Sequence, residues 1–268
     1  MSHDEIRSGF PEIREVSFGA PLRWLAMGFR DIRHCPLPSA FYGCSFAVMG
    51  FALVTVFNHA YQYVAALACG FLLVAPFLAI GLYELSRRRE AGASCRLGPT
   101  LAIWRKNAAN IGVYSLVLTV VFLIWARASL IVFALFYTTQ MPTLSDFLRQ
   151  VWSPDNMDFL FAYFAVGLGF ALLVFAISVV SIPMMMDRGQ DAITAMLASF
   201  LSLVLNFPAM ILWAFLIVVA TAVGFATFYL GLIVAMPLIG HATWHAYRDL
   251  VAVRADASSG AEMPRNDA

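Results

Sequence analysis

The longest uncharged run of the chain covers residues 192–247, and these 56 residues contain no Asp, Glu, Lys or Arg. A soluble fold of this size cannot cover such a run, whereas a hydrocarbon core about 30 Å thick requires about 20 apolar residues for each helical crossing. The run is therefore long enough for two crossings. Apolar residues make up 61% of the chain and charged residues 12%, a balance typical of a polytopic membrane protein.

The predicted architecture is an all-α polytopic membrane helix bundle with six transmembrane helices. A second uncharged run, residues 34–83, has room for two more crossings. The expected spans are residues 39–57, residues 63–83, a helix that begins near Asn110, residues 159–186, residues 206–222 and residues 224–247. Five helices are the alternative, because no strong helix breaker separates the last two spans. The membrane domain covers residues 21–252, between a polar N-terminal tail (1–20) and a disordered C-terminal tail (253–268).

Basic residues are concentrated on one side of the predicted bundle. They occur before the first span and in the linker after the second, as Arg7, Arg14, Arg23, Arg30, Arg33, Arg87, Arg88, Arg89, Arg96, Arg105 and Lys106. On the other side, the loop of residues 137–158 has Arg149 as its one basic residue. Since short cytoplasmic loops are enriched in Arg and Lys, we expect a multi-pass protein of the bacterial inner (plasma) membrane with both termini in the cytoplasm.

A cytoplasmic segment that can form a surface helix precedes each predicted hairpin. Residues 22–34 predict an amphipathic helix at the level of the lipid headgroups, with two opposite faces: Leu22, Leu25, Phe29 and Ile32 on one, and Arg23, Arg30, Asp31 and His34 on the other. Residues 100–106 are a shorter candidate. Asp191 is expected to cap a third helix, residues 192–205, buried against the bundle. A surface helix followed by a hairpin, three times over, suggests three parallel repeats; a bundle without repeats is the alternative.

The four cysteines predict no redox or metal chemistry. Cys44 and Cys69 fall inside apolar spans, whereas Cys35 and Cys95 lie in Arg-rich segments, and no C-x-x-C pair occurs. The spacing therefore gives no indication of a disulfide or a zinc site, and we expect four idle or buried thiols.

Several motifs are distributed along the chain. The second half contains SIPMMMDR at 181–188, AMLAS at 195–199, NFP at 206–208 and PLIGHATWHAYR at 237–248. The first half contains GFRDIR at 28–33, Pro36, Tyr42-Gly43 and GLYE at 81–84. Together, over residues 22–251, they resemble the bacterial integral-membrane family named domain of unknown function 2189. The resemblance implies a six-helix inner-membrane protein of an uncharacterised family, with no established activity.

Two histidines are the first candidates for a functional site. His241 and His245 are four residues apart, so both rings project from one helix face, a spacing that suits a metal or haem ligand pair. In the alternative interpretation, His241 hydrogen-bonds a neighbouring helix and His245 faces the headgroups. A third hypothesis is a proton or substrate site on the cytoplasmic side that combines both histidines with Glu84 and Asp187. Arg248 is expected to mark the cytoplasmic interface.

Arg127 is the one strong charge within the third apolar segment. It lies 17 residues after Asn110, or about 25 Å along a helix at 1.5 Å per residue. We therefore expect it to snorkel at the outer interface beside Trp125, with residues 128–137 in the interface or re-entering the membrane. The alternative is a salt bridge to an aspartate of the outer loop.

The leading functional hypothesis is a non-catalytic accessory or assembly subunit of a membrane complex. Its partners would be the lipid bilayer and another membrane protein, without a cofactor. The net charge of +1 provides no basic field for nucleic acid, and the sequence contains no P-loop, Rossmann or nucleophile motif. One alternative is a small-solute permease or lipid-handling protein with a polar cavity reached by Glu84 and His241. The other is a metal- or haem-binding protein that uses His241 and His245.

Overall fold

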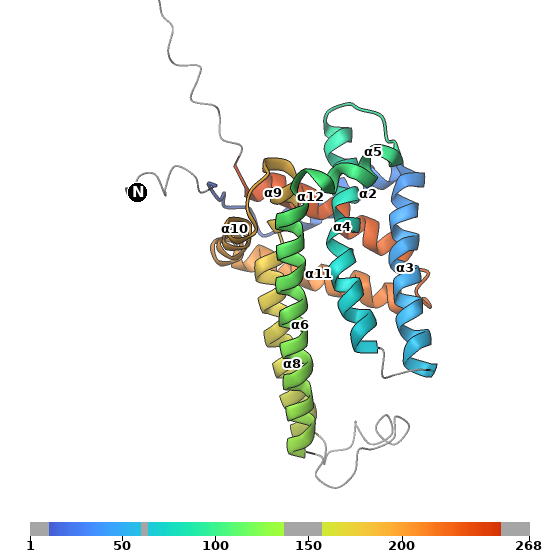
Figure 1. Cartoon of the computed structure of the whole chain (residues 1–268). Coiled ribbons are helices and arrows are strands. Elements are labelled where there is room, and N and C mark those ends of the chain that lie inside the picture. The colour runs from blue at the N-terminus through green and yellow to red at the C-terminus, as the bar shows by residue number, and fades with distance from the viewer. Residues whose placement is uncertain (1–10, 60–63, 137–156, 253–268) are drawn as a thin grey trace, which may run out of the picture.

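The computed structural model describes residues 11–59, 64–136 and 157–252, and the regular elements of these residues are helices (Figure 1). In chain order they are α2 (Ala20–His34), α3 (Pro36–His59), α4 (Val64–Glu90), α5 (Leu97–Ala102), η2 (Ile103–Asn107), α6 (Ala108–Phe136), α8 (Met157–Ser178), α9 (Ser181–Arg188), α10 (Ala192–Leu205), α11 (Phe207–Ala226) and α12 (Leu232–Leu250). The predicted all-α membrane bundle is confirmed. Among the described residues, β-pairing is confined to an isolated bridge between Ile13 and Val251.

Five described segments are long and apolar enough to cross a bilayer: Pro36–Phe57, Leu67–Glu90, Leu97–Phe136, Met157–Arg188 and Phe207–Ala226. The sixth predicted span corresponds largely to α12, which is not among them. The C-terminal half of α12 contains both histidines, Arg248 and Asp249, and these polar side chains lower its hydropathy. The count of six spans and the threefold repeat stay predictions.

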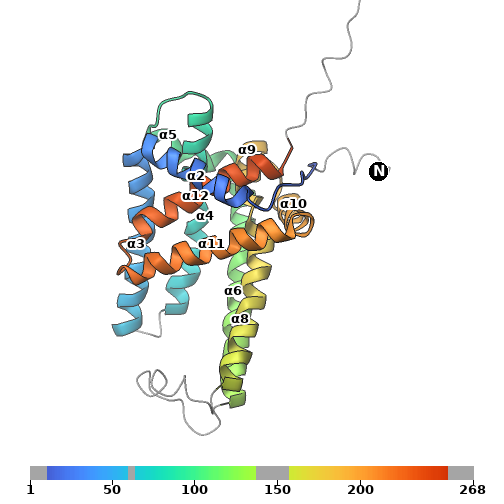
Figure 2. The same cartoon turned by 180° about the vertical axis from the view of Figure 1, so that it is seen from behind.

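Four long helices, α3, α4, α6 and α8, run in roughly the same direction, and α11 lies across them at a steep angle (Figures 1 and 2). The helices α2, α5 and α9 gather at one end of this bundle. Helix α12 packs against α2, α3, α4 and α11. Helix α6 packs against α4 and α8, and α10 packs against α8 and α9.

Helix α12 is at the centre of the packing, and every residue from Gly240 to Tyr247 is buried. Two glycines allow neighbouring helices to approach it closely, as small residues do in membrane bundles. A Cβ added to Gly28 on α2 would lie 2.8 Å from the backbone nitrogen of Ala242. A Cβ added to Gly43 on α3 would overlap the carbonyl oxygen of Ile233. The backbone of α12 is therefore held between α2 and α3.

The predicted amphipathic helix forms as α2, and Asp31 on its polar face is buried against the protein. The buried residues of α2 include Trp24, Gly28 and Asp31, at positions i, i+4 and i+7 of one face. Leu22 and Phe29 are 57% and 43% exposed. In a membrane the apolar face of a surface helix meets lipid, so a polar face is free to pack on the protein.

The N-terminal capping prediction for α10 is confirmed. This helix covers Ala192–Leu205, and the Asp191 carboxylate accepts a hydrogen bond of 2.9 Å from the Thr194 backbone N–H. Residues 100–106 are also helical, but they are divided between α5 and η2.

Three predicted boundaries are corrected. The fourth span is interrupted after Ser178, because Pro183 in the first turn of α9 has no N–H to donate to Val179. Helix α6 continues to Phe136, through the residues expected in the outer interface or in a re-entrant segment. The last hairpin turns after Ala226, not after Ala222, through Phe228 and Tyr229, which have φ angles of 52° and 67°.

The expectation of idle thiols is wrong for two of the four cysteines. Cys35 and Cys95 form a disulfide with a Cα–Cα distance of 5.6 Å, within the usual range for such bonds. Cys44 and Cys69 are free. Cys35 follows α2 and Cys95 follows α4, so the disulfide joins the ends of these two helices.

Candidate functional site: a buried carboxylate and a basic pocket

Asp31 is the centre of a buried polar cluster at the junction of α2, α4 and α12. It is 1% exposed. Its Oδ2 accepts a hydrogen bond from the Ser86 hydroxyl of α4 and lies 2.9 Å from Nε2 of His245 on α12. Its Oδ1 pairs with the guanidinium of Arg89. Because a buried carboxylate is costly unless it is paired and hydrogen-bonded, these three partners account for its position inside the protein.

His241 extends the cluster from Asp31 to α3. Its Nδ1 lies 2.7 Å from the Ser86 hydroxyl oxygen, and its Nε2 lies 2.9 Å from the Ser39 hydroxyl oxygen. Ser86 donates its one hydroxyl proton to Asp31, so it accepts from His241 Nδ1–H. The other ring nitrogen then accepts from Ser39. Because His241 is fully buried and burial disfavours the charged ring, the network selects the neutral Nδ1–H tautomer, with no lone pair left free.

His245 lies between two carboxylates. Its Nε2 contacts Asp31, and its Nδ1 lies 3.5 Å from Oε1 of Glu90 at the end of α4. The side chain is 8% exposed, and whether it faces the headgroups stays a prediction. Both histidines therefore meet the same aspartate, His245 directly and His241 through Ser86.

One of the three hypotheses places Glu84 beside the histidines, whereas the structure pairs it with arginines of its own helix. It is 2% exposed, and its carboxylate accepts two hydrogen bonds from Arg87, of 2.6 and 2.8 Å. Arg88 lies 3.8 Å away. This bidentate pair uses both carboxylate oxygens of Glu84, which does not line the pocket described below.

Asp187 and Arg248 belong to a second polar cluster at the same end of the bundle. The Asp187 carboxylate accepts a hydrogen bond of 2.8 Å from the Tyr247 hydroxyl and lies 3.9 Å from Arg248. Arg188 donates to the same hydroxyl, at 2.9 Å. Arg248 also lies 3.5 Å from Glu90, which therefore connects the two clusters. The four residues Glu84, Asp187, His241 and His245 thus have three different sets of nearest partners, two of which Glu90 connects.

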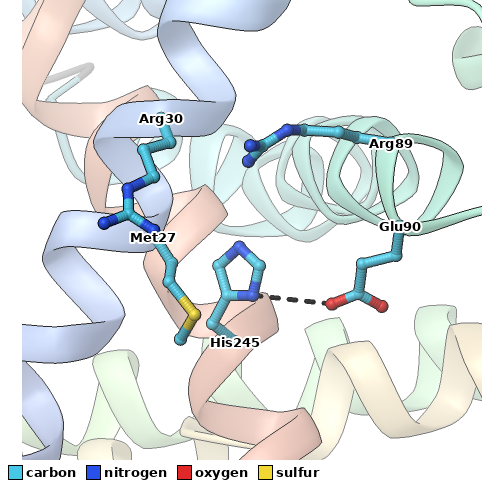
Figure 3. A pocket seen from close by; sticks show the side chains of 5 residues that line it. All are labelled: Met27, Arg30, Arg89, Glu90 and His245. Atoms are coloured by element: carbon cyan, nitrogen blue, oxygen red, sulfur yellow. Dashed lines mark ion pairs between the residues drawn. The ribbon is translucent and has the colours of Figure 1, made fainter. Parts of the chain in front are cut away.

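A cavity of about 340 Å³ opens beside the Asp31 cluster (Figure 3). Its lining comes from three helices: Met27 and Arg30 from α2, Arg89 and Glu90 from α4, and His245 from α12. Figure 3 shows the His245 ring with Met27 on one side and Glu90 on the other, and a dashed line marks its ion pair to Glu90. Arg89 is neutralised by Asp31, whereas Arg30 forms no hydrogen bond or ion pair with any residue that the structure describes. The cavity therefore has one uncompensated guanidinium.

Sequence reasoning missed Asp31, Ser86, Arg89 and Glu90 as site residues. The available signal was the spacing of Trp24, Gly28 and Asp31, which places a small residue and a carboxylate on one helix face. A glycine at that spacing indicates close helix packing in membranes, and a carboxylate beside it indicates a buried partner.

The arrangement favours hydrogen bonding over metal binding for the two histidines. All four ring nitrogens have polar partners. Within the described ranges, no group of three or more His, Cys, Asp or Glu side chains is arranged to hold a metal ion. The metal and haem hypothesis stays a prediction, and it would require the serine and carboxylate contacts to be replaced.

Arg127 lies on α6, away from these clusters. Its side chain is exposed, and it has no ion pair with a described residue, Asp158 included. Because α6 continues to Phe136, residues 128–136 do not re-enter the membrane. Residue 137 and the other aspartates of the loop lie outside the described residues.

Comparison with known families finds a match over part of the chain. Residues 64–187 match the model of a family described as "Predicted integral membrane protein (DUF2189)". The match covers α4 to α9 and confirms, over these residues, the resemblance to domain of unknown function 2189. No curated protein and no solved structure matches the chain.

Proposed function

From the premise that residues 64–187 belong to this family of predicted integral membrane proteins, we propose that the chain is a lipid-handling protein. Its pocket between α2, α4 and α12 binds an anionic phosphate headgroup. The observation that carries the proposal is Arg30, an uncompensated guanidinium on a cavity large enough for a headgroup. The protein lies in the bacterial inner membrane, with the pocket on the cytoplasmic side.

The charges of the lining define the class of ligand. Arg89 and Glu90 carry opposite charges, and Arg89 is further neutralised by Asp31. Glu90 in turn lies 3.5 Å from Arg248. With Arg89 paired to Asp31 and Glu90 paired to Arg248, Arg30 is left without an ionic partner among the described residues, and a monoanionic phosphodiester would balance it. A guanidinium donates two parallel hydrogen bonds to phosphate oxygens, which makes Arg the favoured residue for this contact.

Two other residues of the lining fit the rest of a headgroup. The exposed carboxylate of Glu90 accepts hydrogen bonds from a hydroxyl or ammonium group, and Met27 provides an apolar contact. Helix α2 also exposes Leu22 and Phe29, as a helix at the headgroup level does. The pocket then lies at the depth where lipid phosphates are found.

The Asp31 cluster gives the pocket a rigid wall. Asp31 fixes both Arg89 and His245, and Ser86 links it to His241. A site whose side chains are already held in place loses less entropy when a ligand binds. This is the role we assign to the two histidines.

The test compares ligands on the purified full-length protein in mild detergent. Calorimetric titration with short-chain phosphatidylglycerol, short-chain phosphatidylcholine and inorganic phosphate separates an anionic lipid, a zwitterionic lipid and free phosphate. We expect saturable binding of phosphatidylglycerol and weaker binding of the other two. Equal binding of all three, or no binding, would refute the proposal.

Arg30→Gln is the informative variant, and Arg33→Gln on the same helix is its matched control. Arg33 stacks on the Phe29 ring at 4.4 Å and does not line the cavity. Arg30→Gln should weaken binding about tenfold or more, because a hydrogen bond to a charged group contributes about 1.5–3 kcal/mol. Arg33→Gln should leave the affinity within about twofold. Similar losses in both variants would indicate attraction to surface charge alone.

The accessory-subunit hypothesis stays a separate prediction. That hypothesis rests on the small number of polar groups at bilayer depth. The cavity beside His245 supports the lipid-handling alternative instead, with one change in the residues: His245 and Glu90 line the cavity, in place of His241 and Glu84. A pull-down in mild detergent distinguishes them. A stoichiometric partner chain would support an accessory subunit, and lipid-dependent binding by the isolated protein would support the proposal made above.

A further inference from the structure

We propose that the disulfide between Cys35 and Cys95 is a reversible clamp that holds the end of α2 against the end of α4. This inference rests on the proposed function in one respect, because α2 and α4 form opposite walls of the proposed headgroup pocket. The clamp itself is carried by the position, burial and surroundings of the two cysteines.

Cys35 is firmly attached to the corner between α2 and α3. Its backbone N–H donates to the Asp31 carbonyl at 2.8 Å, and its own carbonyl accepts from Ser39 N–H at 3.1 Å. Asp31 and Ser39 are both members of the buried cluster. A displacement of Cys35 would therefore move the residues that hold both histidines.

Cys95 is attached in a similar way to the end of α4. The turn before it is closed by three backbone hydrogen bonds onto the last turn of α4: Ala91 to Arg87, Gly92 to Arg89 and Ala93 to Arg88, at 2.8 to 3.1 Å. Only four residues separate Cys95 from Glu90. The disulfide thus connects the last turns of both helices.

The two helices that the disulfide joins supply four of the five lining residues of the cavity. Met27 and Arg30 come from α2, and Arg89 and Glu90 come from α4. The ion pair between Asp31 and Arg89 also links the C-terminal ends of these two helices. The disulfide is a second link, and it is covalent. When it is broken, only the ion pair and the neighbouring contacts hold α2 against α4.

The accessibility of the two sulfurs sets the route of exchange. Cys35 is 1% exposed, whereas Cys95 is half-buried. A thiolate of the glutathione pool attacks Sγ of Cys95, the S–S bond breaks, and Cys35 leaves as a thiolate that takes up a proton. A second glutathione thiolate then attacks the mixed disulfide, releases glutathione disulfide and frees Cys95. Oxidation is the reverse, with glutathione disulfide as the oxidant.

The orientation of the chain is the reason to expect reversibility. Both cysteines lie in the Arg-rich segments, which the distribution of positive charge places in the cytoplasm. Cytosolic disulfides of mesophiles are usually transient, because the glutathione and thioredoxin systems keep thiols reduced. A disulfide on this side therefore acts as a redox-dependent link.

The first experiment equilibrates the full-length protein in lipid nanodiscs with glutathione buffers from fully reduced to fully oxidised. Differential alkylation followed by mass spectrometry then counts the free thiols. Cys35 and Cys95 should change together between the two extremes, while Cys44 and Cys69 stay free throughout. A bond that survives the whole range, or one that never forms, would overturn the proposal.

The second experiment measures hydrogen exchange in the last turns of α2 and α4, with and without reductant. We expect reduction to accelerate exchange there roughly threefold to tenfold, as for a local link lost from a stable fold. Cys95→Ser should show the fast rate without reductant, and Cys69→Ser on α4 should behave as wild type. Unchanged exchange on reduction would contradict the clamp. Neither readout requires a ligand, so absence of headgroup binding refutes the proposed function without deciding this inference.

Discussion

The Asp31 carboxylate of α2 lies 2.9 Å from the His245 ring of α12, a contact that joins residues 214 positions apart in the chain. Around this contact, two further helices contribute Ser39, Ser86 and Arg89. The contact fixes the amphipathic N-terminal helix to the most buried helix of the protein. It also forms the wall of the pocket.

Asp31→Ala should destabilise the protein strongly, because it leaves Arg89 and His245 without their carboxylate. Removing one partner of a buried ion pair costs about 3–5 kcal/mol. Reversible unfolding in mixed detergent micelles measures the change. Arg23→Gln is the control: it breaks the pair with Asp249, in which Arg23 is 56% exposed, and should cost less than about 1 kcal/mol. Equal effects of the two variants would refute the central place given to Asp31.

His241 should be neutral and should carry its proton on Nδ1. The reason is the direction of the hydrogen bonds: Ser86 donates to Asp31 and therefore accepts from His241. Nitrogen-15 chemical shifts of labelled His241 distinguish the two tautomers. Ser86→Ala should release this preference, whereas Ser45→Ala on the exposed side of α3 should leave it unchanged. A protonated Nε2 in the wild type would contradict the network.

Gly43→Ala should disturb the crossing of α3 and α12. The added methyl group would overlap the Ile233 carbonyl, and overpacking against backbone costs about 1–3 kcal/mol. Gly112→Ala on α6 is the matched control, because its Cβ would meet nothing within 4 Å. The control should be neutral or stabilising by up to about 1 kcal/mol, as Ala is the better helix former. Unfolding midpoints of both variants test the predicted difference.

The N-terminal cap of α10 should weaken in acid. Hydrogen bonds from Thr194 lower the pKa of Asp191 below its ordinary value of 3.8. A carboxyl whose pKa is lowered by folding contributes its full stabilisation above the unfolded pKa and loses it as the pH falls through the folded pKa. Asp191→Ala should cost about 0.5–2 kcal/mol of local stability near neutral pH, read from hydrogen exchange in the first turn. Asp191→Asn should keep the cap without the pH dependence; a wild-type cap that is unaffected by acid would contradict this assignment.

The sequence predicted the helices of this protein better than their contacts. Uncharged runs defined the long helices, since the thickness of a bilayer sets their minimum length, and Asp191 marked the start of α10. The pattern placed the break at Pro183 inside a continuous span, because Pro is frequent in membrane helices and does not always interrupt them.

Asp31 and the two paired cysteines show what a single sequence could not provide. The amphipathic pattern of residues 22–34 identified the apolar face but not whether lipid or protein covers the opposite face. Each of these residues finds its partner far away in the chain: Asp31 contacts His245 on α12, and Cys35 bonds Cys95 at a separation of 60 residues. Such pairings depend on the packing of α2 against α4 and α12, which composition and spacing do not contain.

The most direct test of the pocket is the distance between Arg30 and a bound phosphate. The full-length protein with nitrogen-15-labelled arginine is reconstituted with phosphatidylglycerol, and phosphorus–nitrogen dipolar couplings are measured by solid-state NMR. We predict a guanidinium signal within about 4 Å of phosphorus, as a charge-assisted hydrogen bond requires, that disappears in Arg30→Gln and persists in Arg33→Gln. A coupling that survives Arg30→Gln unchanged, or no coupling at all, would contradict headgroup binding at Arg30.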